Sequence, residues 1–240
     1  MREGRRPNEL RPLDVQLDYL EQPHGAVLWS QGKTIVLCTA SIEEGVPRWL
    51  RNSGRGWMTA EYSLLPASTG DRVEREARRG KQGGRTIEIQ RLIGRAVRGV
   101  VDFAALGERT VHLDCDVLTA DGGTRCASIT GAYVALALAC DVLLGRGAIE
   151  RSPLNGEVAA VSCGIVGGVP LLDLDYSEDS TAEVDANVVM TGDGGLVEVQ
   201  ATAERTPLSR ANLDALLALA AKGIAELRVT QDRAIDIPAA

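Results

Sequence analysis

The sequence predicts an α+β fold made of two similar halves packed together. In each half, short strand-like runs come first and a long apolar helix pattern comes last, an order that favours this class. No linker rich in Pro, Ser or Gly separates the halves. We therefore expect residues 1–240 to form a single structural domain, with halves at about 8–145 and 150–230.

The composition is typical of a globular protein. The chain has 240 residues, of which 45% are hydrophobic and 25% charged, so it can bury a large core. No run approaches the roughly 18 to 20 uninterrupted apolar residues of a membrane span, and the segment Met1–Arg6 leads into no apolar signal core. We therefore expect a cytoplasmic protein with no membrane partner. The five cysteines are widely spaced without a CxxC pair, which favours buried free thiols.

The charges are segregated along the chain. Residues 48–98 hold twelve basic and five acidic side chains, a net charge of +7 that leaves −14 for the remainder of a chain whose total is −7. Such segregation predicts one surface that meets a polyanion, although a solvated basic helix face would give the same count.

The first half is read as strands followed by helices. Four strands are expected, at Leu13–Leu20, Gly25–Ser30, Thr34–Ser41 and Met58–Leu65. The polar stretch Pro66–Gly84 has no apolar period and predicts a mobile loop. Arg85–Val101 has the i, i+3, i+4 apolar spacing of a helix with one buried face. A strand at Val111–Leu118 and a mostly apolar helix at Thr124–Leu144 complete this half.

The second half follows the same plan. Its four expected strands are Val158–Val166, Val169–Leu172, Thr181–Thr191 and Leu196–Ala203, paired as two hairpins across glycine turns. Ser209 is suited to cap a closing helix at Asn212–Leu227. The tail Val229–Ala240 gives no clear signal.

The sharpest local motif is Leu118–Ser128, in which a strand, a glycine turn and a helix start follow one another. The free N–H groups of a helix's first turn and the positive end of its dipole form an anion site. Thr124 and Ser128 could donate from their hydroxyls, and Arg125 offers a planar fork for two phosphate oxygens. A glycine turn that only caps the helix would show the same pattern, and the GxxxxGK[ST] motif is absent.

The second motif is acidic. Residues 173–185 hold six carboxylates, which repel one another unless a cation or solvent separates them. Two or three carboxylate oxygens with water suit Mg²⁺, while a solvated acidic loop is the alternative. The alternation around Val184 places Asp185 and Asn187 on one strand face, which favours a site.

Four runs resemble the ribonuclease PH family in order and spacing: residues 54–62, 84–95, 114–125 and 173–190. The similarity extends from about Arg6 to Leu227. It implies a ribonuclease PH fold, a duplicated β-α unit with two mixed or antiparallel sheets and helices packed between and around them. It also implies a homohexameric ring, a trimer of dimers.

The resemblance also implies chemistry. Phosphate would be bound by Arg85, Gly123, Thr124 and Arg125, and Asp179 and Asp185 would hold Mg²⁺ or protonate the departing 3′ oxygen. The implied activity is that of a phosphate-dependent 3′→5′ exoribonuclease, a tRNA nucleotidyltransferase. It would use inorganic phosphate as co-substrate, trim the 3′ tails of tRNA precursors and other structured RNAs, release nucleoside diphosphates and run in reverse.

RNA contacts are expected from five arginines: Arg55, Arg72, Arg75, Arg78 and Arg79. These contacts would weaken with rising salt concentration. The chain departs from the family pattern at Ala67, Cys126, Ala201 and Leu208, where Arg, Thr, Gly and Phe are usual. His24 and His112 lie in no motif with a nucleophile and are expected to be structural. Two other functions stay open, a catalytically silent RNA-binding ring subunit and a metal-dependent hydrolytic nuclease.

Overall fold

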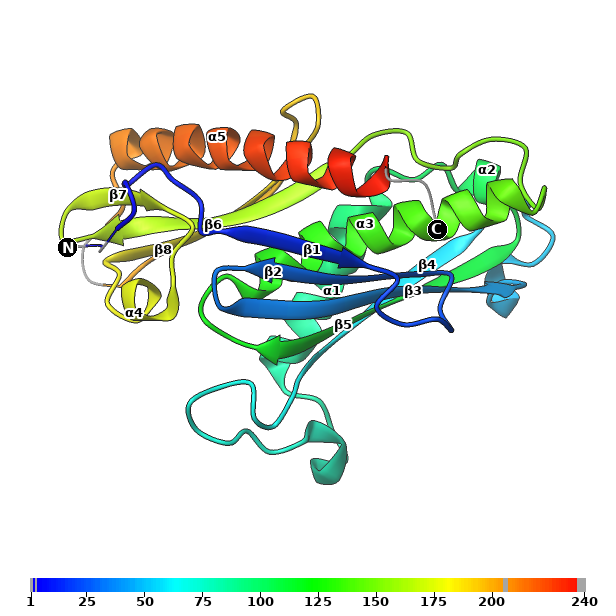
Figure 1. Ribbon diagram of the computed structural model, residues 1–240, viewed down its shortest axis with the longest axis horizontal. Helices are drawn as coiled ribbons and strands as arrows, with labels where there is room; N and C mark the ends of the chain where they lie inside the picture. Colours follow the sequence, from blue (N-terminus) through cyan, green and yellow to red (C-terminus); the bar gives the residue numbers. More distant parts are fainter. Residues whose placement is uncertain (1, 3, 205–206, 237–240) are drawn as a thin grey trace.

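The computed structural model describes residue 2 and residues 4–204 and 207–236, with only the backbone of Arg79. Two sheets with helices between and around them confirm the predicted α+β class (Figure 1). The first sheet has the order β1 (Leu13–Leu17), β2 (Gly25–Gln31), β3 (Thr34–Glu44), β5 (Arg109–Thr119), β4 (Trp57–Leu64). It is mixed, because β4 and β5 run parallel while the other pairs are antiparallel.

The second sheet is antiparallel throughout. Its order is β7 (Val169–Leu172), β6 (Val158–Val166), β8 (Val184–Thr191), β9 (Leu196–Ala203). Strands β6 and β8 are buried along most of their length, as expected for central strands covered on both faces. Pairing of Gly164 with Asp185 and of Ser162 with Asn187 sets which side chains of β8 share one face.

Helix α3 (Thr124–Gly145) lies at the centre and contacts strands of both sheets. It is long and apolar enough to cross a membrane by length and composition, but 78% of its apolar window is buried inside the protein. It is therefore the core helix that joins the two halves. Helix α1 (Gly84–Arg98) packs beside it and buries the predicted face, including Ile89, Leu92 and Ile93.

Helix α5 (Arg210–Ile235) packs across β6 and β7. As predicted, Ser209 caps it, since the Ser209 hydroxyl accepts a bond from the N–H of Asn212 at 3.1 Å. The helix continues beyond Leu227, where its apolar pattern was expected to end. Tertiary contact explains the extension, because the buried side-chain amide of Gln231 donates to the carbonyls of Thr130 and Val158.

Four short elements were not predicted: the 3₁₀ turns η1 (Arg48–Leu50) and η2 (Glu76–Arg79), and the helices α2 (Phe103–Leu106) and α4 (Tyr176–Asp179). Helix α4 lies in the stretch read as acidic. Its capping residue Asp175 accepts from the N–H of Glu178, and the Glu178 carboxylate accepts from the N–H of Asp175. Part of the acidic run therefore builds a helix end, and Asp179 stands at its last position.

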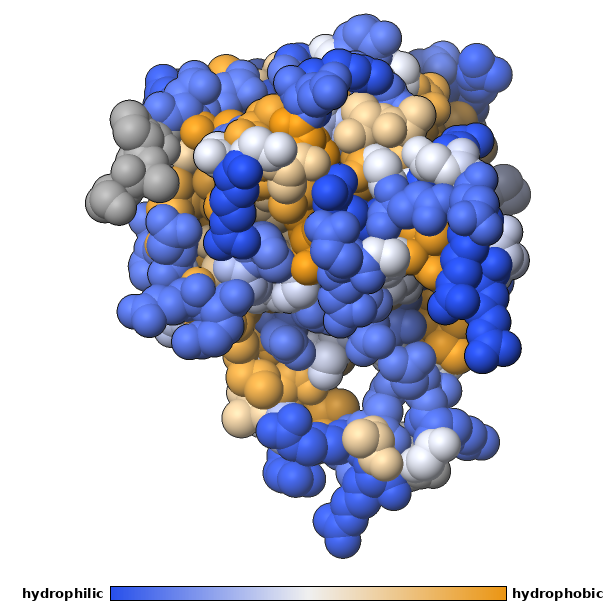
Figure 2. Space-filling model, turned by 90° about the vertical axis from the view of Figure 1, so that its right-hand side faces the viewer, coloured by the Kyte–Doolittle hydropathy of each residue, from blue (hydrophilic) through white to orange (hydrophobic). Residues whose placement is uncertain are grey.

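The loop at residues 66–83, which contains η2, protrudes from the body in both Figure 1 and Figure 2, where its surface is mostly hydrophilic. All five cysteines are buried and free, as predicted. The imidazole of His24 accepts from the N–H of Ile42 at 3.1 Å, and His112 lies 3.5 Å from Glu43. Both histidines lie outside the pocket described below.

Candidate active site

A pocket of about 630 Å³ lies where the two halves of the chain meet. The glycine turn before α3, the first turn of α1, the end of α4 and one face of β8 contribute to its lining. Six residues predicted from the motifs line it: Arg85, Gly123, Thr124, Arg125, Asp179 and Asp185. The fold thus brings basic and acidic groups from distant segments to one cavity.

The turn between β5 and α3 requires glycine at two positions. Gly122 and Gly123 have φ angles of +77° and +64°, in the left-handed region that favours glycine. A Cβ on Gly122 would lie 2.5 Å from the carbonyl oxygen of Leu174, so the turn touches the backbone that leads to α4. Helix α3 begins at the pocket with Thr124, so its positive end and its first free N–H groups lie at this wall.

Two arginines flank the helix start. Nη1 of Arg125 donates to Gln200 at 2.8 Å and to the carboxylate of Glu88 at 3.2 Å, while its other N–H groups make no hydrogen bond to any described residue. Arg85, exposed at the start of α1, makes no hydrogen bond or ion pair within the described residues. Both guanidinium groups therefore have donors available to an anion in the pocket.

The carboxylates of Asp179 and Asp185 are both partly buried. Burial raises the pKa of Asp179, while the charges of Arg85 and Arg125 oppose the rise. Burial also raises the pKa of Asp185, and the nearby Asp179 raises it further. The pair can therefore carry a shared proton or neutralise a cation.

Two carboxylates in one solvent-accessible pocket fit Mg²⁺, which usually takes one or two carboxylates and completes its shell with water and substrate phosphate. In the described part of the chain, no three His, Cys, Asp or Glu side chains gather closely enough to hold a metal ion by themselves. A cation held by these two carboxylates would complete its shell with water or with oxygens of the substrate.

Ser128 does not reach the pocket. Its side chain is fully buried, and its hydroxyl donates to the carbonyl of Thr124 at 2.8 Å, the bond that a helical serine makes one turn back. The structure therefore corrects the expected phosphate contact of Ser128: this residue stabilises the first turn instead.

The expected RNA-binding arginines are dispersed. Arg72 lines the pocket, Arg75 lines a neighbouring one, and Arg78 is exposed on η2. The side chain of Arg79 lies outside the described residues. Arg55 is exposed near the opposite end of β4, roughly 20 Å from the pocket at 3.3 Å per strand residue, so it is remote from the chemistry.

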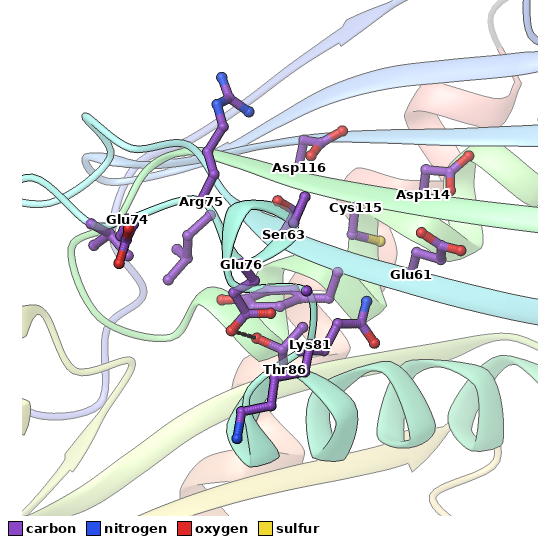
Figure 3. A pocket seen from close by; sticks show the side chains of 16 residues that line it. Glu61, Ser63, Glu74, Arg75, Glu76, Lys81, Thr86, Asp114, Cys115 and Asp116 are labelled. Carbon is purple, nitrogen blue, oxygen red and sulfur yellow. Dashed lines mark hydrogen bonds between the residues drawn. The ribbon is translucent and has the colours of Figure 1, made fainter.

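The neighbouring pocket, of about 620 Å³, is acidic (Figure 3). Glu61 on β4 and Asp114 and Asp116 on β5 form its floor, and Arg75 and Lys81 come from the protruding loop. Burial raises the pKa of both aspartates, and the carboxylate of Glu61 adds to the rise. Although the two cavities are similar in volume, the acidic floor repels phosphate, so this pocket is the poorer candidate for an anion.

Several pocket residues were absent from the predicted site, among them Tyr62 and Tyr176. The strand alternation had placed Asn187 beside Asp185, and both do line the pocket. The Tyr62 and Thr124 hydroxyls are 2.9 Å apart. The thiol of Cys126, which stands where the family has Thr, donates to Asn187 at 3.2 Å. Cys126 therefore supports this wall.

The other three positions that differ from the family pattern have little effect on the local structure. Ala201 pairs in regular register with Ala186, and the irregularity between β8 and β9 falls instead between Val189 and Met190. Leu208 packs, partly buried, against the core, and Ala67 is exposed outside the pocket. None of the three disturbs the pocket lining.

Comparison with known proteins gives two family matches and a set of related structures. The models of the 3′ exoribonuclease family match residues 9–140 for domain 1 and residues 156–223 for domain 2. A rice (Oryza sativa) Rrp46 structure has a TM-score of 0.78 at 19% identity, covering 98% of this chain and 99% of that one.

Two archaeal structures resemble this chain about as closely as the rice structure does. An Archaeoglobus fulgidus exosome with RNA bound to the active site has a TM-score of 0.79 at 23% identity, covering 95% of this chain and 91% of that one. An archaeal exosome core has a TM-score of 0.75 at 22% identity, with 96% and 90% covered. At these identities the structures show a shared fold.

The two family matches cover most of the chain in the order domain 1, domain 2, and they confirm the resemblance read from the four motifs. The protein therefore belongs to the 3′ exoribonuclease family, with the ribonuclease PH fold.

Proposed function

We propose that this protein is a phosphorolytic 3′→5′ exoribonuclease that trims the 3′ tails of tRNA precursors and other structured RNAs. The observation that carries the proposal is a single pocket in which a helix start and two arginines face a pair of partly buried carboxylates. This arrangement suits a reaction with an anionic nucleophile on one side and a leaving oxygen that needs a proton on the other.

Inorganic phosphate would bind against the start of α3. The free N–H groups of Gly123 and Thr124, the guanidinium of Arg125 and the exposed guanidinium of Arg85 supply its donors. Two positive side chains and a helix N-terminus offset the charge of a dianion. They also orient one of its oxygens toward the RNA end.

In the proposed step, this oxygen forms a bond to the phosphorus of the last phosphodiester, and the bond from that phosphorus to the preceding 3′ oxygen breaks. Asp179 or Asp185 gives the departing 3′ oxygen its proton. The products are a nucleoside diphosphate and an RNA shorter by one nucleotide. Because one phosphate ester is exchanged for a diphosphate, the reaction should be readily reversible.

Asp179 and Asp185 would also hold Mg²⁺, which when bound supplies a Lewis acid for the charge on the phosphate and leaving oxygens. Their raised pKa values support this role, since a cation relieves the repulsion between two partly buried carboxylates.

The two rival functions are less well supported. A catalytically silent ring subunit would be expected to lack part of the phosphate or acidic set, whereas this pocket retains Arg85, Arg125, Asp179 and Asp185. A two-metal hydrolase requires more ligands than the pocket offers within the described residues.

The proposal extends to the setting of the reaction: a homohexameric, cytoplasmic ring, a trimer of dimers. The basic segment at residues 48–98 and the exposed loop arginines support a polyanionic partner. In this proposal the loop contacts the body of the RNA, while the pocket handles its 3′ end.

The test is an incubation of an end-labelled tRNA precursor with and without phosphate, each with Mg²⁺ or a chelator. We expect shortening only with phosphate, release of nucleoside diphosphates, and loss of activity on chelation. Release of nucleoside monophosphates in the arm without inorganic phosphate would indicate hydrolysis. The absence of any product in every arm would favour the catalytically silent subunit. Shortening unchanged by the chelator would remove the metal from the proposal.

A further inference from the structure

Arg11 is a buried arginine at the junction of the two halves that no motif singled out. Its side chain is 6% exposed, and it precedes β1 in a segment without periodic pattern. Nη2 of Arg11 lies 2.8 Å from one oxygen of Asp173, and the Arg11 backbone N–H donates to the other oxygen at 2.7 Å. Asp173 is itself 0% exposed. The carboxylate of Asp173 therefore accepts from both the guanidinium and the backbone N–H of Arg11, and the two residues form a buried ion pair.

The other side of the guanidinium holds the glycine turn at the pocket. Nη1 of Arg11 donates to the carbonyl of Asp121, and Nη2 lies 3.4 Å from the carbonyl of Gly122. The hydroxyl of Thr34 also binds the turn, since it donates to the carbonyl of Gly122 at 2.7 Å and accepts from the N–H of Asp121 at 3.0 Å. The carbonyls of the turn are thus bound from the interior.

Asp173 in turn anchors the segment that carries α4. Its N–H donates to the carbonyl of Ser162 at 2.7 Å, and its φ angle of +55° turns the chain toward Asp175, the cap of α4. The backbone of this segment meets Gly122 at the close approach described above. One guanidinium therefore connects the wall that holds the phosphate donors to the segment that ends in Asp179.

We propose that Arg11 is a positioning residue that fixes the separation between the phosphate-binding turn and the carboxylates. The inference rests on the proposed function, because that separation matters only if the two walls act on one reaction. In-line attack requires reacting atoms about 3 to 3.5 Å apart, and a displacement of about 1 Å can cost on the order of 10²-fold in rate. Arginine suits the task because its rigid fork bonds in two directions at once.

The test compares Arg11→Lys with wild type in phosphorolysis at varied phosphate concentration. Lysine keeps the charge and can satisfy either Asp173 or the turn carbonyls, but not both in the arginine geometry. We expect a loss on the order of 10²-fold in kcat/KM for phosphate, with most of the loss in kcat. Affinity for RNA, measured by filter binding, should change less than about threefold.

Arg228→Lys is the matched control. Arg228 also joins a carboxylate, Glu157, to a backbone carbonyl, that of Gly192, but it lies outside the pocket. A general loss of stability would therefore affect both variants, and thermal unfolding measures it. Only Arg11→Lys should lose activity at a temperature where both remain folded.

Thr34→Val gives a milder second test, in case Arg11→Lys fails to fold. It removes the hydroxyl that holds the turn at nearly constant volume, and we expect a loss of roughly tenfold in kcat/KM for phosphate. If the wild type phosphorolyses RNA and both Thr34→Val and any folded Arg11→Lys stay within about threefold of it, the inference is overturned while the function stands. If the wild type shows no phosphorolysis, the proposed function itself fails.

Discussion

Replacing Arg125 by alanine is expected to lower kcat/KM for phosphate by about 10²- to 10³-fold, the usual cost of removing one donor that stabilises a transition state. Arg125 stands at the start of α3, and its remaining N–H groups make no hydrogen bond to any described residue, so they are available to the anion. Alanine removes this fork without changing the glycine turn. RNA affinity should fall only slightly, because the exposed loop arginines remain.

Phosphate titrations of the phosphorolysis rate, with RNA affinity measured in parallel, check this prediction. Arg146→Ala is the matched control, since Arg146 is an exposed arginine at the end of α3, outside both the pocket and the basic segment at residues 48–98. It should leave both quantities near the wild-type values. If Arg125→Ala instead lost RNA binding and phosphorolysis in equal proportion, Arg125 would be an RNA contact and its assignment to phosphate would be wrong.

Asp179→Asn and Asp185→Asn should each reduce kcat by about 10²- to 10⁴-fold, the range typical of a lost general acid or base. Asparagine keeps the shape of the side chain but can neither release a proton to the 3′ oxygen nor balance the charge of Mg²⁺. KM for phosphate should not rise, because the substitution removes a negative charge near the anion. Single-turnover assays at saturating phosphate measure this effect.

The same variants should be at least as stable as wild type at neutral pH. Folding raises the pKa of each carboxyl, so the folded protein binds the proton more tightly than the unfolded chain does. At a pH above the pKa in the unfolded chain, this difference lowers the stability of the folded state. The gain from asparagine is therefore expected at pH 7 and should vanish below the ordinary value of 3.8. Asp214→Asn, at an exposed position on α5 outside the pocket, is the control and should leave activity near the wild-type value. Loss of activity accompanied by a lower Tm at pH 7 would indicate a structural role instead.

Local sequence patterns were sufficient for most of the fold. The helix at α1, the strand before the glycine turn and the apolar helix after it follow from apolar spacing and turn residues within a few positions of each other. The shared face of Asp185 and Asn187 follows from strand alternation. These features depend on neighbours in the chain, so one sequence is enough to predict them.

The features that the sequence did not predict depend mostly on contacts between residues far apart in the chain. The extension of α5 depends on a bond from Gln231 to carbonyls in α3 and β6, and the role of Arg11 depends on Asp173, far along the chain. Ser128 lies in the motif predicted to bind an anion, but its helical position directs the hydroxyl to the carbonyl one turn back. Helix α4 did carry a local signal, the Asp-x-x-Glu spacing of a capping box, which the density of acidic residues concealed.

The central claim is that one orthophosphate binds between the start of α3 and Arg85, opposite the two aspartates. A crystal structure of the protein soaked in phosphate at a concentration that supports turnover tests it most directly. The claim predicts an anion within about 2.7 to 3.2 Å of the Thr124 N–H and of the Arg85 and Arg125 guanidinium groups. Phosphate bound reproducibly elsewhere, with this pocket holding only water, would contradict it.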